Sequence, residues 1–499
     1  MNLNLSTNKS VDSSEVRAGS GGRVRIGVLC VFALVACLIF VATISDVLIV
    51  LLALVGLGVV GLWVIPTFGL TNVAVCFSVL MLLVSGFAER SIPSLGALSD
   101  FAVLTLVLVA VTGRSLPKGP AGVVISAAVY IGFCVVHSVV SAIISTTYAL
   151  NGLYSMLVPI AAVIAGYCLS DRAGQRFKSS TLLLTVVSVG FVINAFLGYR
   201  QAIFGLSGSE EAAAVSANSA YLVRGQARLM GAMPTNQDFG ILCALAAPAF
   251  LLLAMRSSGL TRVLAYFGFA NAIFLSFLTL LRGSLIAAVI SSVVVLLIPL
   301  ASTVGRRVAA VLTIIASVPL FSWLFISFFP SDRVDESVSR VVSLFSLAGD
   351  SSFRARDEYT LPIAIRALEN RIMGSGIGSA GPVSQKFSGV APYGALIPDN
   401  GYFIIAIQIG VLGAASILIC LGWLSLVLLR SVSRHWGVLG ICLFTLPIAF
   451  VFGGYWGLTG PMGILGVLVG CALREHEKAS VDWYEPSRVS PDTQSRLLA

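Results

Sequence analysis

The chain has 499 residues, of which 57% are hydrophobic and only 11% are charged. An ordinary soluble domain has about 25% charged residues, so this composition excludes a soluble enzyme. A helix needs about 20 apolar residues to cross a bilayer, and the apolar content is enough for about 14 such helices. The sequence therefore predicts an all-α integral membrane protein.

Cysteine and histidine are placed where neither indicates a metal site. All nine cysteines lie inside apolar runs, where a thiol behaves as a small hydrophobic group. The sequence has no zinc-binding spacing and no disulfide framework, and its three histidines are scattered. We therefore expect no metal and no cofactor.

Apolar runs bounded by charged residues or by Gly and Pro are the candidate membrane spans. They begin near Ile26, Val47, Thr71, Leu98, Ala121, Gly152, Thr181, Asp238, Val263, Ser284, Val308, Asn400, Gly437 and Gly457. The chain is thus expected to comprise a disordered tail (1–25), seven spans (26–198), a first long outer loop (199–237), four spans (238–329), a long extracytoplasmic loop (330–399), three spans (400–473) and a second tail (474–499).

The basic residues indicate how these spans are oriented, because short cytoplasmic connections retain Lys and Arg. If the N-terminus is inside, 19 of the 31 basic residues lie on the cytoplasmic side, and the short outer connections hold only Arg90 and Arg282. We therefore place both termini in the cytoplasm and the protein in the plasma membrane. The net charge of +9 is therefore explained mainly by basic residues that orient the protein in the membrane, and we expect no nucleic-acid partner.

The long outer loop contains an expected amphipathic helix from Phe353 to Met373. Leu361, Ile365, Leu368 and Ile372 recur at helical spacing, and charged residues occupy the other face. This pattern predicts a helix that lies on the membrane or over the helix bundle. Within that run, Pro362 is expected to start or kink the helix, and Gly374 to cap its C-terminus.

A glycine-rich segment follows this helix. Gly376, Gly378 and Gly381 satisfy the spacing G-x-G-x-x-G, but a dinucleotide site also needs a preceding strand and a following helix, which this loop lacks. The favoured interpretation is a tight loop over a substrate cleft, whose exposed amides approach a phosphate or a sugar.

The expected spans are nearly free of charge in their interiors, which disfavours an ion-coupled transporter. His137 lies within the fifth span, where an interhelical hydrogen bond is favoured over a proton relay. Arginines gather instead on the outer face, and the planar guanidinium suits bidentate recognition of phosphate. The alternative for any single outer arginine is a lipid headgroup contact or a surface salt bridge.

Three segments resemble, in order, motifs of the O-antigen polymerase and O-antigen ligase superfamily of bacterial envelope proteins. They are RLMGAMPTNQDFG (Arg228–Gly240), LTLLRGSLIA (Leu278–Ala287), and the stretch from Arg354 through GSGIGSAG to PDNGYFIIAIQIGVLG. The last ends with Asp399, Asn400, nine further residues and then Gly410-Val411-Leu412-Gly413. This spacing is that of the family, with Asp399 where the family has histidine.

The resemblance implies a membrane glycosyltransferase of GT-C-like fold that uses undecaprenyl-diphosphate-linked oligosaccharides on the outer side of the plasma membrane. In the ligases the histidine is thought to be catalytic, and polymerases vary more at that position. We therefore expect a polymerase of repeat units for an O-antigen, capsule or exopolysaccharide. The alternatives are a ligase that transfers a glycan to a lipid or protein acceptor, and a transporter or flippase of a lipid-linked sugar.

The residues expected to carry this reaction follow from the matched motifs and from their chemistry. Asp399 is the candidate general base and Asn400 its orienting neighbour, although Asp399 is equally expected as the N-cap of the following span. The candidate diphosphate-binding residues are Arg228, Arg282, Arg354 and Arg356; the further substrate contacts are Asn236, Arg366, Gly376, Gly378 and Tyr402. The expected partners are the lipid-linked donor and acceptor, membrane lipids, a flippase and a chain-length regulator.

Overall fold

The structure is a computed structural model of the chain. It describes residues 69–91, 98–112, 121–169, 179–216, 222–223, 226–297, 361–394, 400–429, 439–440, 442–443 and 459–484, with a few single positions at 335–358, 396 and 398. The N-terminal tail, the expected spans from Ile26, Val47 and Val308, and most of the span from Gly437 lie outside these residues.

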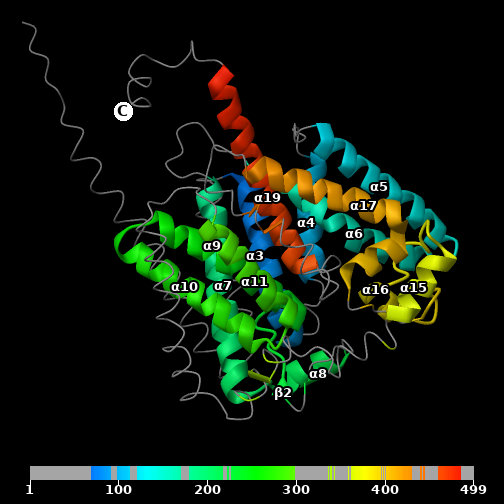
Figure 1. Cartoon of the computed structure of the whole chain (residues 1–499), viewed down its shortest axis with the longest axis horizontal. Coiled ribbons are helices and arrows are strands. Elements are labelled where there is room, and N and C mark those ends of the chain that lie inside the picture. The colour runs from blue at the N-terminus through cyan, green and yellow to red at the C-terminus, as the bar shows by residue number, and fades with distance from the viewer. Residues whose placement is uncertain are drawn as a thin grey trace, which may run out of the picture. The chain divides into compact units, whose positions relative to one another are not determined.

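The described part of the chain is almost entirely helical (Figure 1). Its elements are α3 (Leu70–Ser91), α4 (Leu98–Thr112), α5 (Ala121–Ala142), α6 (Thr146–Tyr167), α7 (Ser179–Phe204), α8 (Gly208–Ser216), β1 (Leu222–Val223), β2 (Gln226–Ala227), α9 (Asn236–Arg256), α10 (Gly259–Leu278), α11 (Arg282–Leu297), α15 (Leu361–Asn370), α16 (Pro382–Lys386), α17 (Gly401–Leu429) and α19 (Thr459–Tyr484). Strands β1 and β2 form a short antiparallel pair in which Leu222 faces Ala227.

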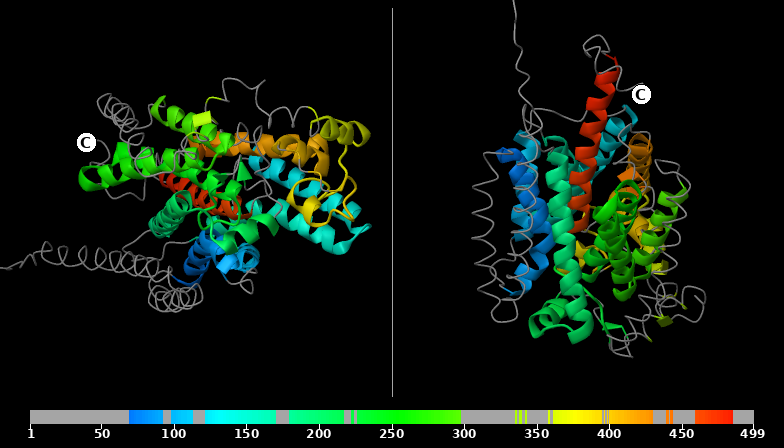
Figure 2. Two further views of the ribbon diagram at one scale, coloured as in Figure 1. Left: turned by 90° about the horizontal axis from the view of Figure 1, so that it is seen from below. Right: turned by 90° about the vertical axis from the view of Figure 1, so that its left-hand side faces the viewer.

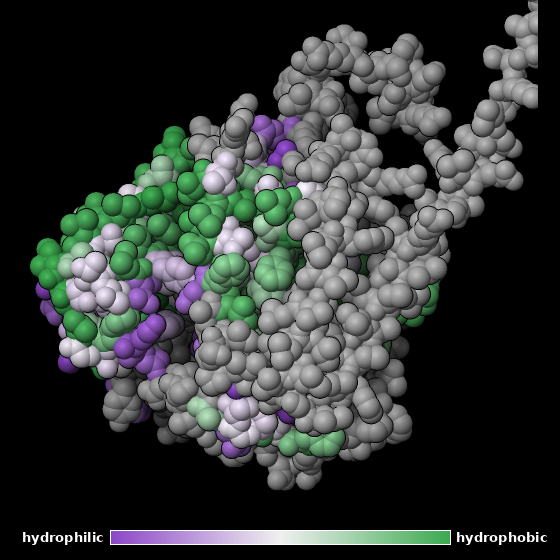
Figure 3. Space-filling view, turned by 180° about the vertical axis from the view of Figure 1, so that it is seen from behind, coloured by the Kyte–Doolittle hydropathy of each residue, from purple (hydrophilic) through white to green (hydrophobic). Residues whose placement is uncertain are grey.

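Among the described helices, α3, α5, α6, α7, α9, α10 and α17 are each long and apolar enough to cross a membrane, and α4 and α11 are shorter apolar helices. Large hydrophobic side chains also face outward, among them Val136 and Val139 of α5 and Leu412 and Trp423 of α17. Figure 3 shows such residues spread over one described face of the molecule. Because exposed apolar surface of this extent requires an apolar surrounding, the chain is a multi-pass membrane protein.

Helices α6 and α19 pack with their backbones close together, and Figure 2 shows α19 running through the interior of the helix group. A Cβ added at Gly166 would overlap the backbone of Val467, and one added at Gly470 would overlap the backbone of Val163. Small residues allow membrane helices to approach in this way. Helix α19 also contacts α3, α4, α9 and α17, so it holds the surrounding helices together.

Several helices finish or begin at one common end, which we call the loop end. There α3 and α7 finish, and α9, α11 and α19 begin. The contacts that define it join Gly86 of α3 to Met233, Gly460 of α19 to Met233 and Asp238, and Gly240 of α9 to Leu281.

The first long outer loop contains more regular structure than the sequence predicts. Helix α7 continues to Phe204, and α8 and the β1–β2 pair follow before α9 begins at Asn236. At the other end of the chain, α19 continues to Tyr484, so it extends into the segment expected to be a tail.

The expected amphipathic helix ends earlier than predicted, at Asn370, and packs through smaller side chains than its apolar stripe predicts. Helix α15 buries Ala364 and Ala367, whereas Ile365 is 40% exposed and Ile372, beyond the helix end, is 62% exposed. Its buried alanines form a cluster with Ala380, Leu396 and Ile407. The helix therefore lies over the bundle, and alanines allow it to approach α17 closely.

Pro362 occupies the second position of α15, where a proline is tolerated, so it starts the helix as expected. The predicted role of Gly374 is wrong. Helix α15 already ends at Asn370, and the N–H of Gly374 closes a separate turn by donating to the carbonyl of Arg371 at 2.8 Å.

Candidate functional site

The segment Arg228–Gly240 contains a short stretch at the loop end, Met230–Met233, which we call the 230–233 connection. Gln201 of α7 reaches it with both ends of its side-chain amide. Its Oε1 accepts the N–H groups of Met230 and Gly231, each at 2.9 Å, and its Nε2 donates to the carbonyl of Gly231 at 3.1 Å. One amide side chain thus fixes three backbone groups of the connection.

Asn194, also on α7, joins the connection to α3. Its Oδ1 accepts the N–H of Ala232 at 2.9 Å, and its Nδ2 donates to the carbonyl of Leu83 at 2.8 Å. The N–H of Phe87, which in a regular helix would bond to Leu83, donates to the carbonyl of Ala232 at 2.9 Å. The connection therefore takes part in the backbone hydrogen bonding of α3.

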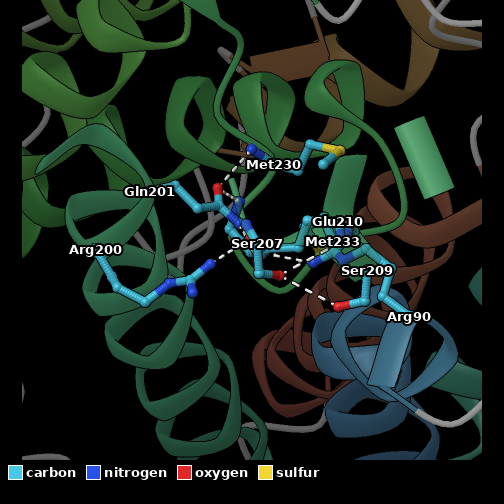
Figure 4. A network of polar contacts seen from close by, with 9 residues as sticks. Arg90, Arg200, Gln201, Ser207, Ser209, Glu210, Met230 and Met233 are labelled. Carbon is cyan, nitrogen blue, oxygen red and sulfur yellow. Dashed lines mark hydrogen bonds and ion pairs between the residues drawn. The ribbon is translucent and has the colours of Figure 1, made fainter. Parts of the chain in front are cut away.

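Arg90, near the end of α3, completes the set of partners. Its two terminal nitrogens donate to the carbonyls of Met233 and Gly231 at 2.6 and 2.7 Å (Figure 4). Together with the turn in which Met233 N–H donates to Met230, every backbone N–H and carbonyl from Met230 to Met233 has a partner. Such complete pairing is expected where backbone is withdrawn from water.

A carboxylate lies beside this buried arginine. Glu210 of α8 forms an ion pair with Arg200 and accepts hydrogen bonds from Nε2 of Gln201 at 2.7 Å and from the N–H of Ser207 at 2.8 Å (Figure 4). Burial raises the pKa of the Glu210 carboxyl, but the Ser207 and Gln201 hydrogen bonds and the charges of Arg200 and Arg90 outweigh it, so the pKa is lowered. Glu210 is therefore ionised and helps to balance the charge of Arg90.

Helix α9 begins directly after the connection with a capping box. Thr235 accepts the N–H of Asp238 through its hydroxyl, and Asp238 accepts the N–H of Thr235 in return, both at 3.1 Å. The first residue of the helix, Asn236, is only 4% exposed, and its Nδ2 has no hydrogen-bond partner among the described residues. A buried donor without an acceptor is costly, and in native proteins it often marks a functional site or a bound group.

The second candidate segment meets the first at the loop end. Arg282 is the first residue of α11, and the turn before it holds Leu280 at a φ of 59°. A Cβ on Gly240 would come within 2.8 Å of Leu281 and 3.1 Å of Ser284. The starts of α9 and α11, which carry Asn236 and Arg282, therefore lie side by side, with Arg228 shortly before the connection.

The other described candidates lie around the start of α17. Asn400 and Tyr402 are at its N-terminus, Arg366 is on the exposed side of α15, and Gly376 and Gly378 pack against α17. Figure 1 shows α15 and α16 beside α17, apart from α9 to α11. The structure thus gathers the candidates in two groups, and Asp399, Arg354 and Arg356 lie outside the described residues.

The glycine-rich segment does not present its amides to a ligand, contrary to the expectation. Helix α17 is interrupted at Gly410 (φ 78°, ψ 168°), which frees backbone groups of the preceding turn. The N–H groups of Ser375 and Gly376 donate to the carbonyls of Ile407 and Gln408 at 2.7 and 3.1 Å. The N–H of Gly378 donates to Oε1 of Gln408 at 2.8 Å. These amides fill the break in α17, because unpaired backbone cannot be left within a membrane.

Asn400 provides the observed cap of α17. The Oδ1 of Asn400 accepts the N–H of Tyr402 at 2.9 Å and, more weakly, that of Phe403 at 3.4 Å. A side-chain acceptor at this place satisfies the free donors of the first turn. Asn400 therefore caps the N-terminus of α17, and Asp399 itself lies outside the described residues.

His137 lies beside the break in α17, where its backbone carbonyl accepts the N–H of Ile377 at 3.4 Å. This bond joins α5 to the glycine-rich segment through the backbone, so it is not the interhelical side-chain hydrogen bond that the sequence predicts.

Sequence reasoning did not select Arg90, Asn194 or Gln201 as functional residues. Arg90 counted only toward membrane orientation, and the two amides lie in or near an apolar run. The available signal was the presence of uncharged hydrogen-bonding side chains in and just beyond a span, which must find partners there.

Neither a known protein-family model nor a curated protein matches the chain. Among the described residues, no group of three or more His, Cys, Asp or Glu side chains could hold a metal ion.

Proposed function

We propose that this protein polymerises undecaprenyl-diphosphate-linked oligosaccharide repeat units into a surface polysaccharide, on the outer face of the plasma membrane. The proposal extends the resemblance of the three motif segments to the O-antigen polymerase and ligase superfamily.

The observation that carries it is the buried Nδ2 of Asn236, which has no acceptor in the described part of the chain. This donor lies at a helix start preceded by Arg228, and the adjacent helix begins with Arg282. A phosphate or sugar oxygen supplies the missing acceptor, and fixed guanidinium groups stabilise the charge on a departing diphosphate.

In the proposed reaction, a hydroxyl of the acceptor unit attacks the anomeric carbon of the donor, and the bond from that carbon to the diphosphate oxygen breaks. The proposal requires the reacting groups of the substrate to lie between the two groups of candidates, where Asp399 takes the hydroxyl proton and Asn400 fixes the backbone that follows Asp399. Arg228 and Arg282, with Arg354 and Arg356, neutralise the lipid diphosphate as it leaves. The donor already carries a good leaving group, so no nucleotide or metal is needed.

The test uses the purified full chain in lipid vesicles with a defined undecaprenyl-diphosphate repeat unit. We expect a ladder of products and release of lipid diphosphate. Asp399→Asn is expected to lower turnover by a factor of about 100 or more, the usual contribution of a general base. Normal product length and rate in Asp399→Asn, with wild-type expression, would contradict the role of Asp399.

Arg228→Lys and Arg282→Lys keep the charge but lose the planar fork, and each is expected to slow turnover about tenfold or more. Arg262→Lys is the matched control, because Arg262 bonds to the carbonyl of Ser257 near the start of α10, away from the loop end. Unchanged turnover in both Arg228→Lys and Arg282→Lys would count against binding of the diphosphate by these residues.

A ligase remains the alternative, and the same assay separates it. Addition of candidate lipid or protein acceptors would then give single transfers in place of a ladder. A transporter is less well supported, since substrates of discontinuous-helix transporters bind the freed backbone groups. In α17 those of Ile407 and Gln408 are taken by Ser375 and Gly376.

A further inference from the structure

We infer that Arg90, Asn194 and Gln201 are positioning residues for this reaction. They hold the 230–233 connection so that Arg228 before it and Asn236 after it are presented together to the lipid diphosphate. The inference rests on the proposed function and adds to it three residues that do not themselves touch the substrate.

Side chains from α3 and α7 converge on the backbone of the connection. Asn194 and Gln201 are fully buried and Arg90 is 7% exposed, and all three direct their polar atoms at the backbone of the connection. Side chains that bind backbone fix the path of a segment whatever its own side chains are. The connection has only the capping residue Thr235 and Pro234 between it and Asn236, so fixing it also fixes the start of α9.

Arg90 brings a buried charge to the connection. Withdrawing a guanidinium from water is costly, and apolar packing in its place is often more stable. The two terminal nitrogens of Arg90 nevertheless donate to two backbone carbonyl groups. Charge-assisted hydrogen bonds of this kind are about twice as strong as neutral ones. Such an arrangement holds a segment in one geometry, which is the role of the residues that support a functional site.

Helix α3 approaches the connection closely. Gly86 leaves room for the backbone of Met233 and Pro234, and a Cβ at Gly86 would overlap both. The connection is thus pressed against α3 on one side and bonded to α7 on the other. Its position depends on two membrane helices, which are more rigid supports than a loop.

Gln201→Met removes all the hydrogen bonds of this side chain at nearly constant volume, and Arg90→Lys is a second variant that keeps the charge but loses the fork. Tyr130→Phe is the matched control, because the buried Tyr130 hydroxyl donates to Met156 between α5 and α6, away from the connection. Two quantities are measured on the full chain in vesicles: hydrogen exchange of the Met230, Gly231 and Ala232 amides, and kcat and KM with the lipid-linked repeat unit.

In Gln201→Met we expect about tenfold faster exchange at Met230 and Gly231 and about tenfold lower kcat, with a smaller effect in Arg90→Lys and none of either kind in Tyr130→Phe. The double variant Gln201→Met with Arg228→Lys should lose less activity than the product of the two single losses, because residues that act through one another are not additive. Full additivity would overturn the inference.

The outcomes separate this inference from the proposed function. Faster exchange with unchanged kcat and KM overturns the positioning role alone and leaves the polymerase proposal standing. A wild-type protein that makes no product and releases no lipid diphosphate overturns the proposed function and the positioning role together.

Discussion

At Gly86, helix α3 lies close against the backbone of the 230–233 connection. Because a Cβ there would overlap the backbone of Met233, and backbone cannot move aside as a flexible side chain can, Gly86→Ala should lower the free energy of unfolding by about 3 kcal/mol or more. Thermal unfolding of the purified protein in detergent measures this change.

Gly132 provides the control, since it is also helical but has nothing within 4 Å of an added Cβ. Gly132→Ala should be neutral or stabilising by up to about 1 kcal/mol, the difference in helix propensity. Equal unfolding midpoints for the two variants would show that the backbone contact at Gly86 carries no weight.

Glu210 makes the region around the connection sensitive to acid. Its pKa is lowered in the folded protein below the ordinary value of 4.5, so its ionisation stabilises the fold fully above that value. This stabilisation is lost as the pH falls through the lowered pKa. Unfolding midpoints measured from about pH 7 down to about pH 3 should therefore fall less steeply in Glu210→Gln than in the wild type.

The exposed neighbour Glu211 lies on the same helix, so Glu211→Gln makes the same change of charge without disturbing the ion pair with Arg200. Its acid profile should follow the wild type. Identical profiles for Glu210→Gln and the wild type would argue that the ion pair does not stabilise the fold.

At the residue level, the sequence identified candidate functional side chains better than it identified their hydrogen-bond partners. It selected Asn236 and Arg282, which lie at neighbouring helix starts. It missed the amides of Asn194 and Gln201, because their roles depend on backbone that lies between 29 and 111 positions away in the chain. The hydrophobic pattern of a sequence predicts which residues are buried, but it does not predict which polar groups form hydrogen bonds with one another.

Among the elements, α17 is distinguished by its break. Gly410 adopts a positive φ of 78°, and a Cβ there would lie 2.6 Å from the carbonyl carbon of Met373. Gly410→Ala should therefore destabilise the protein by about 2 kcal/mol or more, through backbone strain together with overlap. Thermal unfolding is again the measurement.

Gly422 lies on the same helix, and nothing lies within 4 Å of its added Cβ. Gly422→Ala should leave the midpoint unchanged or slightly higher, since alanine is the better helix former. If Gly410→Ala and Gly422→Ala had the same unfolding midpoint, the break in α17 would not contribute to the stability of the fold.

The sequence predicted long apolar helices well and their interruptions poorly. Helices α4 and α5 begin where their apolar runs begin, because hydrophobic length is a direct requirement of the bilayer. The break in α17 follows from its pairing with Ser375 and Gly376, and a glycine in an apolar run does not by itself indicate such pairing. Helix α8, with its two glutamates, lies in a segment that lacks any apolar period.

For the whole molecule, the distribution of basic residues predicts which end of the helices faces the cytoplasm. Ser388 follows α16, near the start of α6, and Ser258 precedes α10; both are exposed. In spheroplasts of an expressing bacterium, Ser388→Cys should react with a membrane-impermeant maleimide from outside, and Ser258→Cys only after permeabilisation.

The wild-type chain is the control for this labelling, because the seven cysteines in the described residues are all buried and should give a low background. Labelling of Ser258→Cys but not of Ser388→Cys in intact spheroplasts would reverse the predicted orientation, and would place the loop end and its arginines in the cytoplasm.

The glycine contact between α6 and α19 also determines when the helices can pack during synthesis of the chain. The two helices meet at residues as much as 310 positions apart in the chain, as Tyr167 and Glu477 do. A ribosome that adds about 5 to 20 residues per second needs about 15 to 60 s to cover that distance. Throughout that interval the glycine face of α6 is without its partner, so the helix group cannot close until the last helix has been synthesised.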